Sequence, residues 1–125
     1  MGTRILNFFD GFTSNTTPAT LGVTGSVASP TAITAAGGIT PSGFSEEMMY
    51  IAGSGGAIDI TANPQIVAGT IDGQILKLYG TSDVNTVTLE DGNGLELRGS
   101  VLLGANDFIE LQWNLTSWAE TSRNN

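Results

Sequence analysis

The sequence contains no histidine and no cysteine among its 125 residues. Histidine is the usual general base and metal ligand near neutral pH, and cysteine supplies the strong nucleophile, the thiolate ligand and the disulfide. Without these residues, no Ser/His/Asp or Cys/His catalytic set can form. We therefore predict a protein that is not an enzyme, holds no metal and uses no cofactor.

Positive charge is also scarce. Only Arg4, Lys77, Arg98 and Arg123 are basic, against twelve acids, and the net charge is −8. Because a phosphate-binding face needs clustered Lys and Arg, the composition argues against nucleic acid and against an anionic membrane surface as partners. No apolar run approaches the roughly 20 residues that span a bilayer. The apolar patch at the N-terminus stops at Asp10, which makes it too short for a secretory signal.

Charged residues are absent altogether from Gly11 to Ser45. This stretch is mostly Thr, Ser, Ala, Gly and Pro, with isolated Leu, Val and Ile, and it is too poor in large side chains to build a core. Thr and Val favour extended backbone, and the prolines bar a continuous helix. We predict that residues 1–45 form an extended, uncharged N-terminal arm that orders against another surface. A flexible linker is the alternative.

The first twelve residues favour the arm over the linker. They crowd large apolar side chains around one cation, and a free tail would leave those side chains in water. Burial of each large side chain would contribute about 1.5–3 kcal/mol. The predicted anchoring residues, for a capsid or a neighbouring subunit, are Arg4, Ile5, Leu6, Phe8, Phe9 and Phe12.

Residues 46–125 show a different pattern, in which short alternating apolar runs are separated by Gly-, Asn- and Asp-rich turns. Turns at intervals of roughly 8–12 residues are typical of a small all-β sandwich or barrel. We predict an all-β domain, a small antiparallel sandwich or jelly-roll-like block, with one face of each strand buried. Met48–Ala52 is predicted as a strand, although Glu46 and Glu47 after Ser45 would also suit a helix start. The predicted β-core residues are Ile58, Ile60, Leu76, Leu78, Val87, Leu89, Leu95, Leu97, Ile109, Leu111, Trp113 and Trp118.

A β block of this size buries only a modest fraction of its surface and is marginal alone. Since neither a disulfide nor a metal can brace it, we predict oligomerisation, as a homotrimer or a dimer.

Two carboxylate pairs, Glu46-Glu47 and Glu90-Asp91, are the nearest approach to a catalytic set. A glycosidase needs two carboxylates that face each other across a sugar. Neighbours on a strand point to opposite faces, so these pairs are interpreted as turn and solvent-facing acids.

Three further motifs are interpreted as structural. Asp91–Glu96 lacks the ligand spacing of a calcium loop and predicts a hairpin turn. Gly53–Gly56 lacks the Lys-Ser/Thr of a phosphate-binding loop and is interpreted as a hairpin connection. Trp113 and Trp118 are predicted to lie in the core, and the alternative is a platform on which sugar rings stack.

The order of the turns from Asp72 to Asn125 resembles a small β module that recurs in tailed-phage virion proteins. The matching pieces are Asp72-Gly73-Gln74, Gly80–Asp83 before Asn85–Leu89, Asp91-Gly92, Leu95–Leu97, Gly104–Asp107 before a strand that ends in Trp113, and Trp118 with the tail Ser122–Asn125. Asn114-Leu115 stands where such modules often carry Asp-Gly. The matching stretch covers under half of the chain.

The resemblance implies a homotrimeric structural part of a virion, made in the host cytoplasm. The uncharged arm favours a capsid decoration (cement) protein on the head surface, whose partners are further copies of itself and the major capsid protein. An arm without charges can lie on a protein surface without burying unpaired ions. The alternative is a short tail fibre or receptor-binding tip that recognises host surface glycan.

Overall fold

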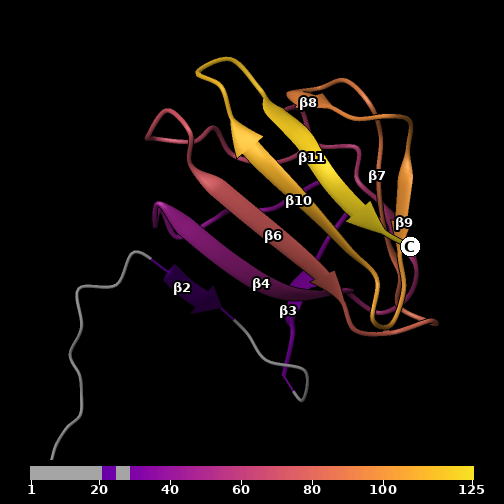
Figure 1. The fold of residues 1–125 in the computed structure, drawn as a ribbon. Helices are drawn as coiled ribbons and strands as arrows, with labels where there is room; N and C mark the ends of the chain where they lie inside the picture. The colour runs from indigo at the N-terminus through magenta and orange to yellow at the C-terminus, as the bar shows by residue number, and fades with distance from the viewer. Residues whose placement is uncertain (1–20, 25–28) are drawn as a thin grey trace, which may run out of the picture.

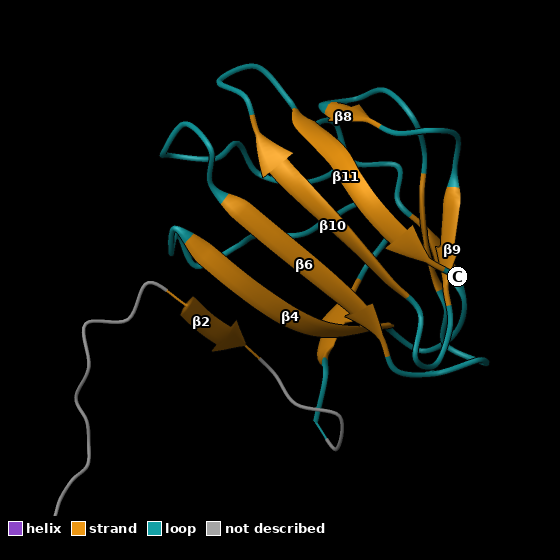
Figure 2. Ribbon diagram, viewed as in Figure 1, coloured by secondary structure: helices purple, strands orange, loops and turns teal. Residues whose placement is uncertain are grey.

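The structure is a computed structural model that describes residues 21–24 and 29–125. Within these ranges the chain forms strands and loops and no helix (Figure 2). The all-β prediction is confirmed. The strand predicted at Met48–Ala52 is present as β4 (Glu46–Gly53), so the alternative helix start does not form.

Over the described residues, the larger of two sheets contains seven strands. Its order is β2 (Leu21–Thr24), β4, β6 (Ile75–Gly80), β10 (Phe108–Trp113), β11 (Trp118–Asn124) and β8 (Leu95–Glu96). β3 (Thr31–Ile33) follows β2 along the same edge of β4, because β2 pairs with Glu46–Met49 and β3 with Ile51–Gly53. Figure 1 shows β4, β6, β10 and β11 running side by side across the molecule.

The smaller sheet contains three strands, in the order β5 (Ile58–Asp59), β7 (Val87–Leu89) and β9 (Val101–Leu103). In Figure 1, β7 and β9 lie to the right of the large sheet, and the two sheets together form a curled half-barrel.

The chain alternates between the two sheets, and we call each circuit through the large sheet and then the small sheet a coil. β4 and β6 lie in the large sheet, whereas β5 and β7, which follow them, lie in the small one. Glu46 pairs with Ile75 and Ile58 with Val87, so successive coils stack in parallel with an offset of 29 residues in both sheets. Antiparallel pairing appears only toward the C-terminus, where β9 pairs with β7 and β10 pairs with β6 and β11.

The sheets are therefore mixed and not purely antiparallel as predicted. The physical reason is the connection: a strand that is followed by a crossing to the other sheet meets its own sheet again one coil later, in the same direction. Gly53–Gly56, predicted to be a hairpin connection, is one of these crossings, since β4 and β5 belong to different sheets.

The core lies between the two sheets. Alternation along the strands turns Leu76 and Leu78 inward from β6 and Ile109 and Leu111 inward from β10, all at most 1% exposed. The remaining core residues are Ile33, Ile39, Met49, Ile51, Ile60, Ile66, Val87, Leu89, Leu95, Val101, Leu103, Trp113 and Trp118, with Ile58 and Leu97 partly buried against them.

Part of the predicted arm belongs to this core. Ile33 lies on β3 and is 2% exposed, and Ile39 forms a parallel bridge with Ile66 and is 1% exposed. Ile33 and Ile39 are each a single inward side chain through which this segment packs on the next coil. The described part of residues 29–45 therefore packs against the β domain and is not separate from it.

Candidate functional site

The outer face of the large sheet carries side chains in three rows that cross β4, β6 and β10. The register places Glu46, Ile75 and Gln112 in the first row, Met48, Lys77 and Glu110 in the second, and Tyr50, Tyr79 and Phe108 in the third. These nine residues alternate with the core residues, because successive side chains on a strand point to opposite faces. We call this set the outer face.

The third row is aromatic. The ring centroids of Tyr50 and Tyr79 are 5.7 Å apart, and those of Tyr79 and Phe108 are 5.3 Å apart with an interplanar angle of 27°. All three side chains are half-buried. The row therefore offers an apolar, ring-lined strip to a partner.

The second row is charged. Lys77 Nζ lies 3.7 Å from Glu110 Oε1 and 5.3 Å from the centroid of the Phe108 ring. The Thr121 hydroxyl of β11 donates to Glu110 Oε2 at 2.9 Å. The cation–π contact links the charged row to the aromatic row.

Two hollows open on this side of the molecule. One, of about 310 Å³, is lined by Glu46, Glu47, Met48, Ile75, Lys77 and Glu110. The other, of about 230 Å³, is lined by Tyr50, Tyr79, Gly80, Thr81, Ala105 and Asn106. The first sets the outward carboxylates of Glu46 and Glu110 against one ammonium, and we call it the acidic hollow; the Glu47 carboxylate is buried and accepts from the Ser42 N–H. The second hollow holds aromatic rings beside hydroxyl and amide groups.

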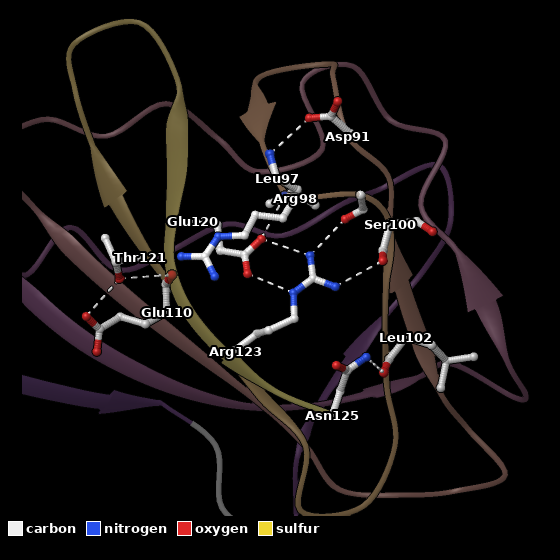
Figure 3. A network of polar contacts seen from close by, with 11 residues as sticks. Asp91, Leu97, Arg98, Ser100, Leu102, Glu110, Glu120, Thr121, Arg123 and Asn125 are labelled. Carbon is white, nitrogen blue, oxygen red and sulfur yellow. Dashed lines mark hydrogen bonds and ion pairs between the residues drawn. The ribbon is translucent and has the colours of Figure 1, made fainter.

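A polar network joins the two sheets where the C-terminal strand meets β9 (Figure 3). Arg123 donates from Nε to Glu120 Oε2 at 2.7 Å, and from Nη1 and Nη2 to the carbonyls of Ser100 at 3.2 Å and Gly99 at 2.8 Å. The side chain of Asn125 donates to the carbonyl of Leu102 at 3.5 Å. These bonds cover one carbonyl group of β9, the terminal strand of the small sheet, and two carbonyl groups of the loop that leads into it.

The pKa of Glu120 is lowered from its ordinary value of 4.5, chiefly by its hydrogen bonds with the Arg123 guanidinium. The backbone N–H of Arg98 also donates to this carboxylate, while burial opposes the shift. The same contact raises the pKa of Arg123. Because the Glu120 side chain is only 1% exposed, we interpret the pair as a structural clasp.

Two carboxyl groups do meet on the small sheet, but not the sequence neighbours considered above. The side chain of Glu90 lies against Asp59, which raises the pKa of Glu90, first through a hydrogen bond between the two side chains. The pairing follows from the parallel offset of β5 and β7, which the sequence pattern did not reveal. No group of three or more Asp or Glu side chains in the described ranges could hold a metal ion.

The turn between β10 and β11 departs from the Asp-Gly expected by resemblance. Asn114 Oδ1 accepts from the backbone N–H groups of Thr116 at 3.1 Å and Ser117 at 2.8 Å. Leu115 occupies the apex with φ of 77° and is 65% exposed. A left-handed conformation costs a leucine roughly 1–2 kcal/mol, so the turn is kept at an energetic cost.

The predicted turn at Asp91–Glu96 has the predicted chemistry. Gly92, Asn93 and Gly94 have φ of 101°, 47° and 91°, and Gly92 and Leu95 exchange two backbone hydrogen bonds of 3.0 Å. It is a tight antiparallel bridge and no calcium loop.

The predicted anchoring residues, Arg4, Ile5, Leu6, Phe8, Phe9 and Phe12, lie outside the residues that the structure describes. The predicted β-core residues lie in one cluster. Trp113 and Trp118 are 8% and 0% exposed with ring centroids 5.4 Å apart, so they are core side chains and no surface platform. The outer-face aromatic row was not predicted, although its members are the outward positions of the predicted strands.

Comparison with known proteins found no matching family model, no matching curated protein and no matching solved structure. Over the described residues, no helix has the length and hydropathy needed to cross a membrane.

Proposed function

We propose that this chain is a structural virion protein, a homotrimeric capsid decoration (cement) protein that attaches to the outer head shell. One observation carries the proposal. β2, which lies inside the charge-free segment, adds to the edge of the large sheet through four consecutive backbone pairs with β4. The segment thus binds by strand addition, in which main-chain hydrogen bonds supply affinity without any charged contact.

The two ends of the coil stack support the same proposal. On the small sheet, Arg123 covers the carbonyls of Gly99 and Ser100, just before the terminal strand β9, and Asn125 covers the Leu102 carbonyl within it. Among the residues that the structure describes, β2 is a terminal strand of the large sheet, and it belongs to a stretch without a charged residue. Charged side chains are a common means of blocking unwanted strand pairing. The uncharged edge is therefore the one suited to another protein.

The test is the position of the protein on intact particles. A tag at the C-terminus, detected by electron microscopy, should mark many sites over the head shell. Particles that lack the protein should lose integrity at lower temperature or lower salt than complete particles. Label restricted to the tail, or unchanged particle stability, would refute the proposal.

The arm and the trimer each have a direct test. Deletion of residues 1–12 should abolish association with particles, because these residues hold the predicted anchor. Sedimentation of the purified full chain should give the mass of three chains over a wide concentration range. A mass of one chain at every concentration would exclude the homotrimer.

A second candidate function, a receptor-binding tip for host surface glycan, is favoured by the aromatic row. Tyr50, Tyr79 and Phe108 could stack on sugar rings, and the adjoining hollow supplies the hydroxyl of Thr81 and the amide of Asn106. In this case the purified protein should bind host cells or their polysaccharide, and Tyr79→Ala should weaken that binding. A decoration protein should bind neither.

A further inference from the structure

The outer face is apolar for a surface that meets solvent. Met48, Tyr50, Ile75, Tyr79 and Phe108 are half-buried, and in Figure 1 no described segment passes in front of β4, β6 and β10. Contiguous apolar patches of this kind mark sites of interaction. The length and chemistry of the remaining chain indicate what occupies this one.

The acidic hollow selects for an occupant with positive charge. It is lined by two outward-facing acids, Glu46 and Glu110, against a single ammonium, that of Lys77, which lies 3.7 Å from Glu110. The aromatic row next to it selects for large apolar side chains. An occupant that satisfies both carries one cation beside several apolar residues.

The N-terminal segment Arg4–Phe12, with the sequence RILNFFDGF, has this composition. Arg4 is the only cation before Lys77, and Ile5, Leu6, Phe8, Phe9 and Phe12 follow it within eight positions. Its single acid, Asp10, lies toward the end away from Arg4.

The chain between this segment and the sheet is long enough. Nine residue steps separate Phe12 from Leu21, and an extended chain covers ~3.3 Å per residue, or about 30 Å in all. Leu21 pairs with Glu46 at the edge strand. From there to the aromatic end of β10 is three strand spacings across and four residues along, or about 19 Å on the diagonal. A tether that reaches its site holds the segment at an effective concentration near the millimolar range.

We propose that Arg4–Phe12 docks on the outer face of its own chain, with its apolar side chains on the aromatic row and Arg4 at the acidic hollow. The inference goes beyond the proposed function, because it assigns the position of the segment in the free protein, before any shell is bound. Docking would remove from water both the segment and the face it covers.

Paramagnetic relaxation enhancement tests the proposal in the full chain. The sequence has no cysteine, so Asn7→Cys provides one site for a nitroxide label. Amide signals of β4, β6 and β10 should lose intensity in the labelled protein and recover when the nitroxide is reduced. Signals of β5, β7 and β9 on the small sheet, about 10 Å behind the large sheet, should lose less intensity than those of the large sheet.

Two further changes to the labelled chain establish specificity. Tyr79→Glu places a carboxylate in the aromatic row and should restore the signals, whereas Val84→Glu, at a side chain 78% exposed in the β6–β7 loop, should not. Arg4→Glu provides an independent check outside the sheet and should also restore them, because it sets a further carboxylate against the acidic hollow.

The proposal would be overturned if no signal lost intensity, if the small sheet lost more intensity than the large sheet, or if the loss survived both Tyr79→Glu and Arg4→Glu. A mixture of unlabelled ¹⁵N chain with nitroxide-labelled ¹⁴N chain distinguishes docking on the same chain from docking on a neighbouring copy. Loss in the ¹⁵N chain of that mixture would show docking on a neighbouring copy and overturn docking on the same chain. All measurements use the free protein, so failure here leaves the particle-labelling test of the decoration function unaffected.

Discussion

Gln65 provides the sharpest test of how the coils are held together. Its side chain is 0% exposed and forms three hydrogen bonds to the loop that follows β7. Nε2 donates to the carbonyls of Glu90 at 2.7 Å and Gly92 at 3.0 Å, and Oε1 accepts from the Glu90 N–H at 2.9 Å. The amide thus adds side-chain bonds to the backbone bond between the two coils, which the Gln65 N–H donates to the Asn93 carbonyl at 3.0 Å.

Gln65→Met keeps the volume of the side chain and removes all three bonds. At about 1 kcal/mol for each buried hydrogen bond, the free energy of unfolding should fall by about 3 kcal/mol. Urea denaturation followed by the fluorescence of the buried Trp113 and Trp118 measures this change. The protein concentration must be fixed, because oligomerisation adds to apparent stability.

The same substitution at Gln112 is the control. Gln112 is exposed and makes one long bond of 3.4 Å to the carbonyl of Gly73, so Gln112→Met should change stability by less than about 0.5 kcal/mol. If Gln65→Met fell within that same range, the side-chain bonds would not hold the coils and the reasoning would be refuted.

Three other predictions concern single positions. Arg123→Met should lower stability at neutral pH. The wild-type advantage should be lost as pH falls through the lowered pKa of Glu120, because that carboxylate stabilises the fold only while ionised; an advantage that stays constant down to pH 3 would contradict the clasp. Gly80→Ala should destabilise by about 1–3 kcal/mol or more in thermal unfolding, because its Cβ would lie 2.1 Å from the Gly104 carbonyl oxygen; wild-type stability would show that this contact can relax. Leu115→Gly should raise stability by about 0.5–1 kcal/mol in urea, since it relieves the left-handed leucine, and a loss of stability would count against strain at the turn.

The strands could be predicted because alternation is a local property. β6 and β10 bury Leu76, Leu78, Ile109 and Leu111 on the predicted face, and turn residues bound both strands. The partner of each strand is not a local property. An alternating run pairs equally well in either direction, so the parallel stacking of β4 on β6 could not be read from the run itself.

The 29-residue offset between coils is only weakly visible in the sequence. Tyr50 and Tyr79 occupy equivalent positions at the 29-residue offset and contact each other as cross-strand partners on the outer face, with their rings tilted at 48°. Ile33 and Ile39 were assigned to the arm because each is an isolated apolar residue among small ones. Parallel pairing between coils, which no local pattern encodes, brings both into the core.

The directions of the strands explain why the two ends of the stack differ. At the C-terminal end, β10 turns back through Leu115 to β11, and Arg123 then reaches the carbonyls beside β9. At this end the last strand of the chain, β11, pairs antiparallel with β10 and so ends the parallel stacking of the coils. At the N-terminal end, β2 and β3 lie parallel to β4 within a charge-free segment, so no reversal among the described residues closes this side. A new strand can therefore pair with β2 and extend the large sheet without displacing a charged side chain. A Lys substitution within residues 21–24 should weaken the binding of such a strand more than it lowers the stability of the fold.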